Sequence, residues 1–260
     1  MKKPNILWIC TDQQRFDTLG CYGNGFVKTP HLDRLAQNGV LFDYCYSQSP
    51  VCTPSRASFL TGRYPRTTRC RQNGQSIPAD EVLVTRLLSD AGYTCGLSGK
   101  LHLSTCQPRV CPTTERRIND GYAEFHWSHH PAPDWPTSDY GHWLREHGVK
   151  YETPPSPHSR YIRIGMPAEY HQTTWCAQKA INCIEAHANL DRPWLFSVNI
   201  FDPHHAFDPP VAYLERYLDR LDEIPLPNYT HGELDNKPLF QQIDHRGAYG
   251  GNPRSFLTTR

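Results

Sequence analysis

The sequence has almost no net charge, because 27 lysine and arginine residues are balanced by 26 aspartate and glutamate residues. A formal charge of +1 creates no general field towards nucleic acid or a membrane, so neither is expected as a partner. Any affinity for anions must therefore be local. The sequence also has little low-complexity content, and its 260 residues, 38% of them hydrophobic, suffice for one large domain with a substantial core.

A long apolar run at the start of the sequence is also missing. Only six apolar or neutral residues follow the Lys3-Pro4 start before Thr11, which is too short for a signal-peptide core or a membrane span. We therefore expect a cytoplasmic protein, in which most of the ten cysteines are reduced thiols. Cys106 and Cys111 lack a second matching pair, so the sequence gives little support to a zinc site.

Segments of strand and helix character alternate along the chain, which indicates an α/β fold. Apolar or alternating runs predict strands at residues 5–10, 40–46, 93–97 and 193–201. Apolar periodicity with start and stop signals predicts helices at residues 28–39, 54–62, 80–89 and 173–188. Residues 104–170 are rich in Pro, His, Trp and Tyr, so we expect loop-rich insertions over the ligand edge of the sheet within a single domain of residues 1–260.

Polar residues follow three of the predicted strands, at the edge where open α/β sheets usually bind ligands. Asp12 and Gln13 offer a carboxylate and a carbonyl oxygen to a divalent cation. Lys100 and His102 are two residues apart, so in an extended segment they project to the same side, which suits an anion. His204 follows the last strand in a proline-rich segment. Taken alone, these residues also fit polar strand ends exposed to solvent.

A cysteine lies beside the start of the helix predicted at residues 54–62. Pro54 suits the first turn and Gly62 can end the helix in a left-handed conformation. Backbone N–H groups and the helix dipole converge near Cys52, which favours an anionic ligand or a lowered thiol pKa. Arg56, in the first turn, carries a fork of donors that matches sulfate or phosphate. The alternative is a capped helix preceded by a buried structural cysteine.

Four landmarks resemble, in the same chain order, motifs of the type I, formylglycine-dependent sulfatases of the alkaline-phosphatase superfamily. They are residues 4–13 (family P-N-I-L-x-I-x-x-D-[DQ]), residues 52–63 (C-x-P-S-R…T-G-R), residues 99–103 (G-K-W-H-L) and residues 202–210 (D-P-H-x-P-F-x-P-P). Leu101 replaces the usual tryptophan, Ala206 replaces a proline, and Gln13 stands at the second acidic position. Four ordered matches are far more specific than any one of them.

The resemblance implies a mostly parallel central sheet with helices on both faces, and hydrolysis of a sulfate ester of a small molecule or saccharide. Cys52 would be converted to formylglycine by a maturation enzyme, and a hydroxyl of its hydrate would attack sulfur. A divalent cation would bind at Asp12, Gln13 and residue 52. Calcium is the expected ion, with magnesium and manganese as alternatives.

The resemblance also assigns roles to the remaining landmark residues. Arg56 and Lys100 would stabilise charge on the sulfuryl oxygens. His102 would assist the nucleophile, and His204 would bind the ester oxygen or protonate the leaving group. These four residues and Cys52 form the predicted catalytic set.

Two alternatives remain open on the sequence. Gln13 also occurs in branches that include phosphonate monoester hydrolases, so a phosphate or phosphonate ester is a second substrate class. A catalytically impaired, truncated fragment is the other alternative, because the family's later metal-binding pair is not found and Asp244-His245 lacks a preceding apolar strand. We therefore expect an N-terminal portion whose sheet is incomplete. The natural substrate and the oligomeric state are left open.

Overall fold

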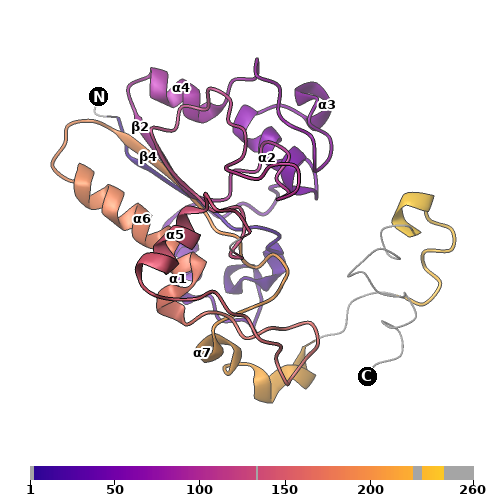
Figure 1. The fold of residues 1–260 in the computed structure, drawn as a ribbon. Coiled ribbons are helices and arrows are strands. Elements are labelled where there is room, and N and C mark those ends of the chain that lie inside the picture. Colours follow the sequence, from indigo (N-terminus) through magenta and orange to yellow (C-terminus); the bar gives the residue numbers. More distant parts are fainter. Residues whose placement is uncertain (1–2, 133, 225–229, 243–260) are drawn as a thin grey trace. The chain divides into compact units, whose positions relative to one another are not determined.

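The computed structural model describes residues 3–132, 134–224 and 230–242 (Figure 1). The strands are β1 (Ile6–Cys10), β2 (Thr94–Gly99), β3 (Glu124–Trp127) and β4 (Trp194–Asn199). The α-helices are α1 (Pro30–Asn38), α2 (Cys52–Thr61), α3 (Pro65–Thr68), α4 (Val84–Asp90), α5 (Asp139–Glu146), α6 (Gln172–His187) and α7 (Val211–Leu214). Short 3₁₀ helices are η1 (Phe16–Thr18), η2 (Gly20–Tyr22), η3 (Ala168–Tyr170) and η4 (Leu218–Glu223). Within these residues no helix combines the length and apolar character needed to cross a membrane.

The chain divides into two compact units, Met1–Asp219 and Arg220–Arg260. All four strands and all the predicted site residues belong to the first unit. The single domain over residues 1–260 stays a prediction. Asp244-His245 lies outside the described residues, so its interpretation is also unchanged.

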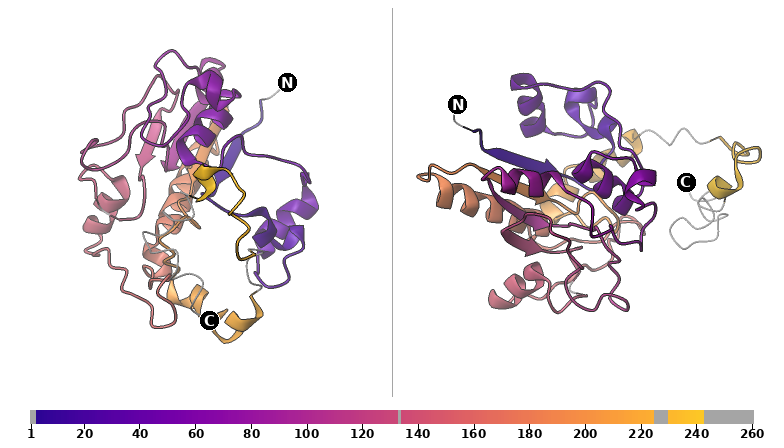
Figure 2. Two further views of the ribbon diagram at one scale, coloured as in Figure 1. Left: turned by 90° about the vertical axis from the view of Figure 1, so that its right-hand side faces the viewer. Right: turned by 90° about the horizontal axis from the view of Figure 1, so that it is seen from above.

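The sheet of the first unit has the strand order β1-β4-β2-β3, and every neighbouring pair is parallel (Figure 2). β4 comes last in the sequence and lies between β1 and β2, which do not pair with each other. Helices occur in the β1-to-β2 and β3-to-β4 connections, whereas residues 100–123 join the parallel strands β2 and β3 without one. The predicted α/β class with a parallel central sheet is confirmed.

Alternation along β4 explains why helices cover both faces of the sheet. Leu195 packs into a core cluster built with residues of α2 and of the segment leading to α4. Trp194, Phe196 and Val198 project to the other face and pack with α5 and α6. Burial of all six residues of β4 follows from this two-sided packing. Figure 1 shows α2 and α4 on one side of the sheet, with α5 and α6 on the other.

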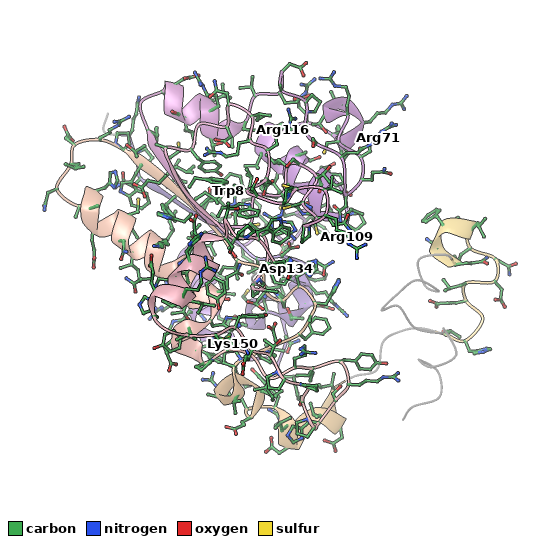
Figure 3. All side chains as sticks on the ribbon, in the orientation of Figure 1. Trp8, Arg71, Arg109, Arg116, Asp134 and Lys150 are labelled. Carbon is green, nitrogen blue, oxygen red and sulfur yellow. The ribbon has the colours of Figure 1, made fainter. Side chains whose placement is uncertain are left out.

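β1 is covered on one face only, although a continuous apolar run such as that of residues 5–10 predicts a strand buried on both faces. Leu7 and Ile9 are 44% and 54% exposed, whereas the alternate residues are half-buried. On the covered face, the ring of Trp8 extends from β1 and lies 5.5 Å from the ring of Phe59 in α2 (Figure 3). Period-2 alternation therefore places one half of β1 in the core and leaves the other half at the surface.

Three predicted elements differ from the structure in their formation, covering or start. Residues 40–46 form no strand, because they lie exposed and pair with no strand among the described residues. The apolar stripe of α1 is likewise largely uncovered, with Leu32 and Leu35 at 40% and 66% exposure. Helix α4 begins at Val84, four residues after the predicted start at Asp80. The spacing of apolar residues indicates where a strand or helix can form, but it does not show whether another part of the chain packs over its apolar face.

The loop-rich region of residues 104–170 contains two elements that were not predicted. β3 is a four-residue edge strand paired with β2, and α5 packs against it. Ser138 is a residue type that favours a helix start, and its hydroxyl accepts the Gly141 N–H at the start of α5. Tyr140 and Leu144, four residues apart, share the buried face of this helix. Residues 105–107, 129–132 and 151 of this region line the cavity described below.

Candidate active site

The carboxyl ends of three parallel strands bring distant residues together. The backbone register aligns Cys10 of β1 and Gly99 of β2 with Asn199 of β4. Residues that follow these strands therefore start from one edge of the sheet. Asp12, Lys100 and His204 follow β1, β2 and β4, respectively. The backbone continues this alignment, since the Asp12 N–H donates to the Asp202 carbonyl at 3.2 Å.

Gly99 makes the approach between β2 and β4 possible. Its φ is +96°, and a Cβ atom there would lie 2.1 Å from the carbonyl oxygen of Asn199. Only glycine combines this left-handed backbone with so close a contact. The glycine that precedes Lys100 therefore fixes where the Lys100 side chain leaves the sheet.

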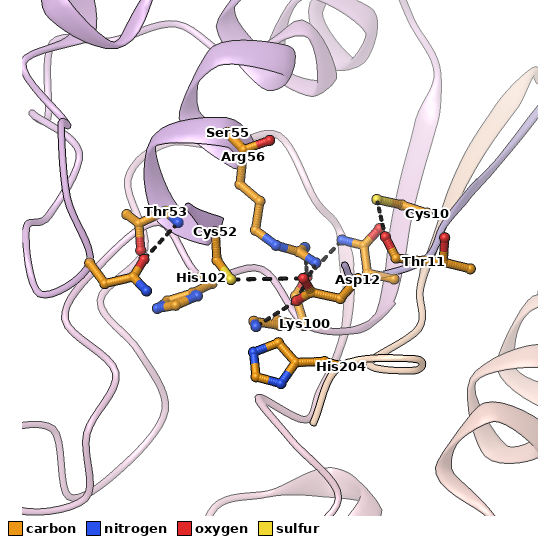
Figure 4. A network of polar contacts seen from close by, with 12 residues as sticks. Cys10, Thr11, Asp12, Cys52, Thr53, Ser55, Arg56, Lys100, His102 and His204 are labelled. Atoms are coloured by element: carbon orange, nitrogen blue, oxygen red, sulfur yellow. Dashed lines mark hydrogen bonds and ion pairs between the residues drawn. The ribbon is translucent and has the colours of Figure 1, made fainter. Parts of the chain in front are cut away.

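Helix α2 presents Cys52 at its first residue, two positions before the predicted start at Pro54. Val51 is extended and accepts the Ser55 N–H, and Gly62 ends the helix with φ +68°. The Cys52 side chain is 9% exposed, and its sulfur lies 3.7 Å from Oδ1 of Asp12. The helix start therefore directs a nearly buried thiol at the carboxylate that follows β1 (Figure 4).

Asp12 is the centre of a buried charge cluster. Its Oδ2 atom lies 2.6 Å from Nζ of Lys100 and 3.3 Å from Nη2 of Arg56. Burial alone would raise the pKa of Asp12, but the two cations outweigh it and the pKa is lowered. The second arm of Arg56 donates to the Lys100 carbonyl oxygen at 2.7 Å, and the Asn199 amide donates to the same oxygen at 2.8 Å. Two cations facing one carboxylate leave a local excess of positive charge.

Two histidines complete the predicted set. His204 joins Asp12 and Cys52 in a group whose ligand atoms lie within 4.8 Å of one another. His102 is 6% exposed, and burial together with the charges of Lys100 and Arg56 lowers its pKa to about 3, so it is neutral at pH 7. Both histidines lie beside Cys52 and Lys100 in Figure 4.

The geometric reason predicted for His102 is wrong. The chain leaves β2 at Gly99, and His102 adopts a left-handed backbone with φ +57° rather than continuing an extended segment. Lys100 therefore reaches Asp12 while His102 packs edge-to-face against His129, with ring centroids 4.4 Å apart. A loop, not a strand end, brings these two side chains to the same cavity.

The cavity has a volume of about 820 Å³. Its lining includes five of the predicted site residues, Gln13, Cys52, Lys100, His102 and His204. Arg56 lies behind them, buried against Asp12. The structure thus brings together all seven residues predicted for catalysis and metal binding. Their chemical roles remain predictions.

Sequence reasoning missed Glu115, which holds the loop that carries His102. Glu115 is 2% exposed, and its carboxylate accepts the N–H groups of His102 and Leu103 and the indole N–H of Trp127, each at 2.8 Å. Nothing in the surrounding polar sequence distinguishes Glu115 from a surface residue. Only the fold, by burying Trp127 and the loop together, reveals its position.

His129 belongs to the loop-rich region of residues 104–170, where histidines are frequent, and it is 7% exposed and lines the cavity. Its Nδ1 atom is buried and has no hydrogen-bond partner among the described residues. Burial lowers its pKa, so the ring beside His102 is neutral at pH 7. No sequence pattern marked it, because its burial depends on the packing of Trp127 and Trp135 around it.

The donor set fits a divalent cation in part. The Asp12 carboxylate and the Gln13 carboxamide offer oxygen, and the group with Cys52 and His204 is compact. A hard cation such as calcium takes six to eight oxygen ligands, which exceeds what these residues supply. Lys100 and Arg56 also already neutralise Asp12. These residues would form one side of a cation site, and other ligands would have to complete it.

Comparison with known proteins agrees with this geometry. The sulfatase YidJ of Escherichia coli is 31% identical over 253 residues, which are 94% of this chain and 46% of that protein. The ulvan-active sulfatase of Formosa agariphila is 34% identical, over 83% of this chain and 38% of that protein. The solved phosphonate monoester hydrolase of Agrobacterium radiobacter is 26% identical with a TM-score of 0.63, over 82% of this chain and 44% of that one.

The chain spans less than half the length of each of these three proteins. The sulfatase family model matches residues 4–233, which include every residue of the candidate site. The chain therefore belongs to the sulfatase family.

Proposed function

We propose that this chain carries the nucleophile side of a sulfatase that hydrolyses a sulfate ester, with formylglycine formed from Cys52. The observation that carries the proposal is the position of Cys52. Its sulfur lies at the start of α2, 3.7 Å from Asp12, on a cavity that Lys100 also lines. A nucleophile with cations beside it suits attack on an anionic ester.

The chain's own residues account for binding and charge stabilisation. Formylglycine would supply a hydroxyl nucleophile at position 52, and a divalent cation at Asp12 and Gln13 would add positive charge. Lys100 and Arg56 hold the Asp12 carboxylate and offer donors to oxygens whose charge grows during the reaction. Calcium is the proposed cation, and magnesium or manganese would satisfy the same oxygen donors less completely.

The two histidines divide the proton chemistry. His102 is neutral at pH 7 because its pKa is about 3, so it accepts a hydrogen bond from the nucleophile rather than repelling the cations beside it. His204 lies on the other side of Cys52 and Asp12, where it can hold the ester oxygen and donate a proton to the leaving alcohol. Both imidazoles line the same cavity, which supports these roles.

The substrate class is a sulfate ester of a small molecule or saccharide. The cavity of about 820 Å³ is large enough for a sugar ring as well as the sulfate group. One relative is named for activity on ulvan, and its 34% identity supports a saccharide for this chain. One tyrosine and one histidine on the cavity wall, Tyr151 and His130, provide flat surfaces against which a sugar ring can pack.

A phosphate or phosphonate monoester is the second candidate substrate. The observation in its favour is Gln13, together with the 26% identity to a phosphonate monoester hydrolase. The positive cluster attracts either kind of anion, so charge alone does not separate them. Rates measured side by side with an aryl sulfate and an aryl phosphonate on the same preparation would decide which ester is preferred.

Mass spectrometry of the Cys52 peptide tests the proposal directly. After co-expression with a formylglycine-generating enzyme, the peptide should lose about 18 Da, the difference between a cysteine side chain and an aldehyde. Cys52→Ser is the matched control and should keep its unmodified mass. A Cys52 peptide that stays a thiol under these conditions, in a preparation where a known sulfatase is converted, would contradict the proposal.

A further inference from the structure

A second cluster of metal-ligand side chains lies away from the candidate active site. Glu124 is the first residue of β3, and Cys183 and His187 lie near the end of α6. One ligand atom from each residue lies within 4.8 Å of the others. The cluster adjoins the start of β3, whereas the candidate active site lies beyond the carboxyl ends of the strands.

The spacing along α6 places two of these ligands side by side. Cys183 and His187 are four residues apart, so they occupy the same face of α6. Nδ1 of His187 lies 2.9 Å from the Cys183 carbonyl oxygen and 3.6 Å from the Cys183 sulfur. The imidazole is therefore held against the helix beside the thiol. Contact with a backbone carbonyl is the usual way in which a ligating histidine is oriented.

The charge and exposure of the cluster also suit a bound cation. Cys183 is 4% exposed, while the Glu124 side chain is 37% exposed, so one side of the cluster is open to solvent. In the described ranges, no lysine or arginine forms an ion pair with Glu124. Its recorded partner is His126, whose Nε2 lies 3.9 Å away. A half-buried carboxylate without a strong cationic partner is left facing a thiol and an imidazole.

We propose that Glu124, Cys183 and His187 bind a zinc ion, with water as the fourth ligand. Thiolate, imidazole and carboxylate are the ligands that zinc prefers, and three protein ligands with water complete a tetrahedral shell. Binding releases the Cys183 proton to solvent, because the thiolate is the ligand. The ion would tie the edge strand β3 to the end of α6. Calcium and magnesium, which prefer oxygen, would not compete well.

A third group of metal-ligand side chains is less suited to a metal ion. Cys106, Glu115 and His129 also place ligand atoms within 4.8 Å of one another. Both oxygens of Glu115, however, already accept N–H groups of the loop and of Trp127. Binding of a metal there would compete with these hydrogen bonds. The Glu124 carboxylate carries no such commitment to backbone donors among the described residues.

Cobalt titration of the metal-free, unmodified chain tests the proposal. Cobalt should give a thiolate-to-metal charge-transfer band and the strong visible bands of tetrahedral coordination, and added zinc should remove them. Cys183→Ser should abolish the charge-transfer band of this site and reduce zinc stoichiometry by one equivalent. Cys52→Ser and Cys106→Ser are matched controls that should retain both. Zinc should also raise the unfolding temperature of the wild type, with little effect on Cys183→Ser.

Substitutions at the two partly exposed ligands, Glu124 and His187, separate a loss of zinc binding from a loss of folding. Glu124→Gln and His187→Gln should keep the wild-type circular dichroism and weaken zinc binding by about tenfold or more. His147→Ala, which changes an exposed histidine of the α5 end, should have no effect. The proposal is wrong if the two ligand variants fold and bind zinc as tightly as the wild type, or if the charge-transfer band persists in Cys183→Ser. Neither result depends on conversion of Cys52 or on sulfatase activity.

Discussion

The ammonium Nζ of Lys100 lies 2.6 Å from Oδ2 of Asp12, and both side chains are almost completely buried. The pair joins the residue that follows β2 to the residue that follows β1, across the intervening strand β4. Arg56 makes a second, longer contact with the same oxygen. An arrangement of this kind leaves the two cations held in place before any anionic ligand arrives, so their donors need little rearrangement.

Lys100→Ala and Arg56→Ala should each lower the turnover of a sulfate ester by the formylglycine-bearing enzyme roughly a hundredfold or more. Each removes a donor to oxygens whose charge grows in the transition state, and such a loss costs about 3–4 kcal/mol. Either variant leaves Asp12 one cationic partner, so folding should survive. Arg34→Ala, an exposed change on α1, is the matched control and should keep normal turnover. Near-normal rates in either site variant would refute the assigned role.

Glu115→Gln should lower both stability and turnover, although Glu115 is behind the cavity wall. An amide in place of the carboxylate turns a donor towards one of the three N–H groups that Glu115 accepts, and a buried unpaired donor costs about 1–3 kcal/mol. The expected result is a lower urea midpoint with a fall in kcat that exceeds the change in KM. Glu152→Gln, at a surface ion pair, is the control. Equal effects in the two variants would show that Glu115 does not position the His102 loop.

Stability should fall as the pH drops below about 6.5, the ordinary pKa of histidine. Burial lowers the pKa of His102 to about 3 and also lowers that of His129, so the unfolded chain binds protons that the folded chain does not. Each such group costs up to about 1.4 kcal/mol per pH unit below 6.5. Burial raises the pKa of Glu115, which acts in the opposite direction.

Comparison of two proteins isolates the histidine contribution to this pH dependence. His129→Gln removes one of the buried imidazoles, whereas Glu115 is common to both proteins. Urea unfolding at pH 7.5 and pH 5.5 should show a smaller loss of stability in His129→Gln than in the wild type. Identical losses would mean that His129 takes up a proton in the folded state as readily as in the unfolded chain.

Calcium should bind weakly to the 260-residue chain. Asp12 and Gln13 offer few oxygens, and Lys100 and Arg56 already balance the Asp12 charge. Sites with so few carboxylates fall at the weak end of the calcium scale, with Kd on the order of 10⁻⁴ to 10⁻³ M. Calorimetric titration is the measurement, with Asp12→Asn as the variant that should abolish the remaining signal. Tight, stoichiometric binding would show that the described donors suffice.

The strands that deliver the site were predictable because their sequences are unambiguous. β1 and β4 are short apolar runs followed by polar residues, and parallel pairing brings such ends to one edge whatever the strand order. Motif resemblance then named Cys52, Arg56 and His204 before any geometry was known. Helices α2 and α6 followed from their start and stop signals and from apolar spacing.

The remaining features depend on neighbours that no local pattern specifies. Residues 40–46 alternate like a strand, yet strand formation needs a partner, and none is paired with them in the described part of the chain. β3 is too short to stand out, and Glu115 looks like any charged residue beside Arg116 and Arg117. The exposure of Leu7 and Ile9 was hidden for the same reason, since periodicity does not reveal which sheet face is covered.

Because β4 lies between β1 and β2 in the sheet, the sheet can assemble only after β4 has been synthesised. β1 and β2 each pair with β4, so neither gains that neighbour until Asn199 has been made. Cys52 precedes Asn199 by 147 residues, which at ribosomal speed corresponds to an interval on the order of ten seconds. During that interval the edge that later buries Cys52 is unassembled. An enzyme that modifies this cysteine would therefore find it most accessible on the growing chain, before β4 pairs with β1 and β2.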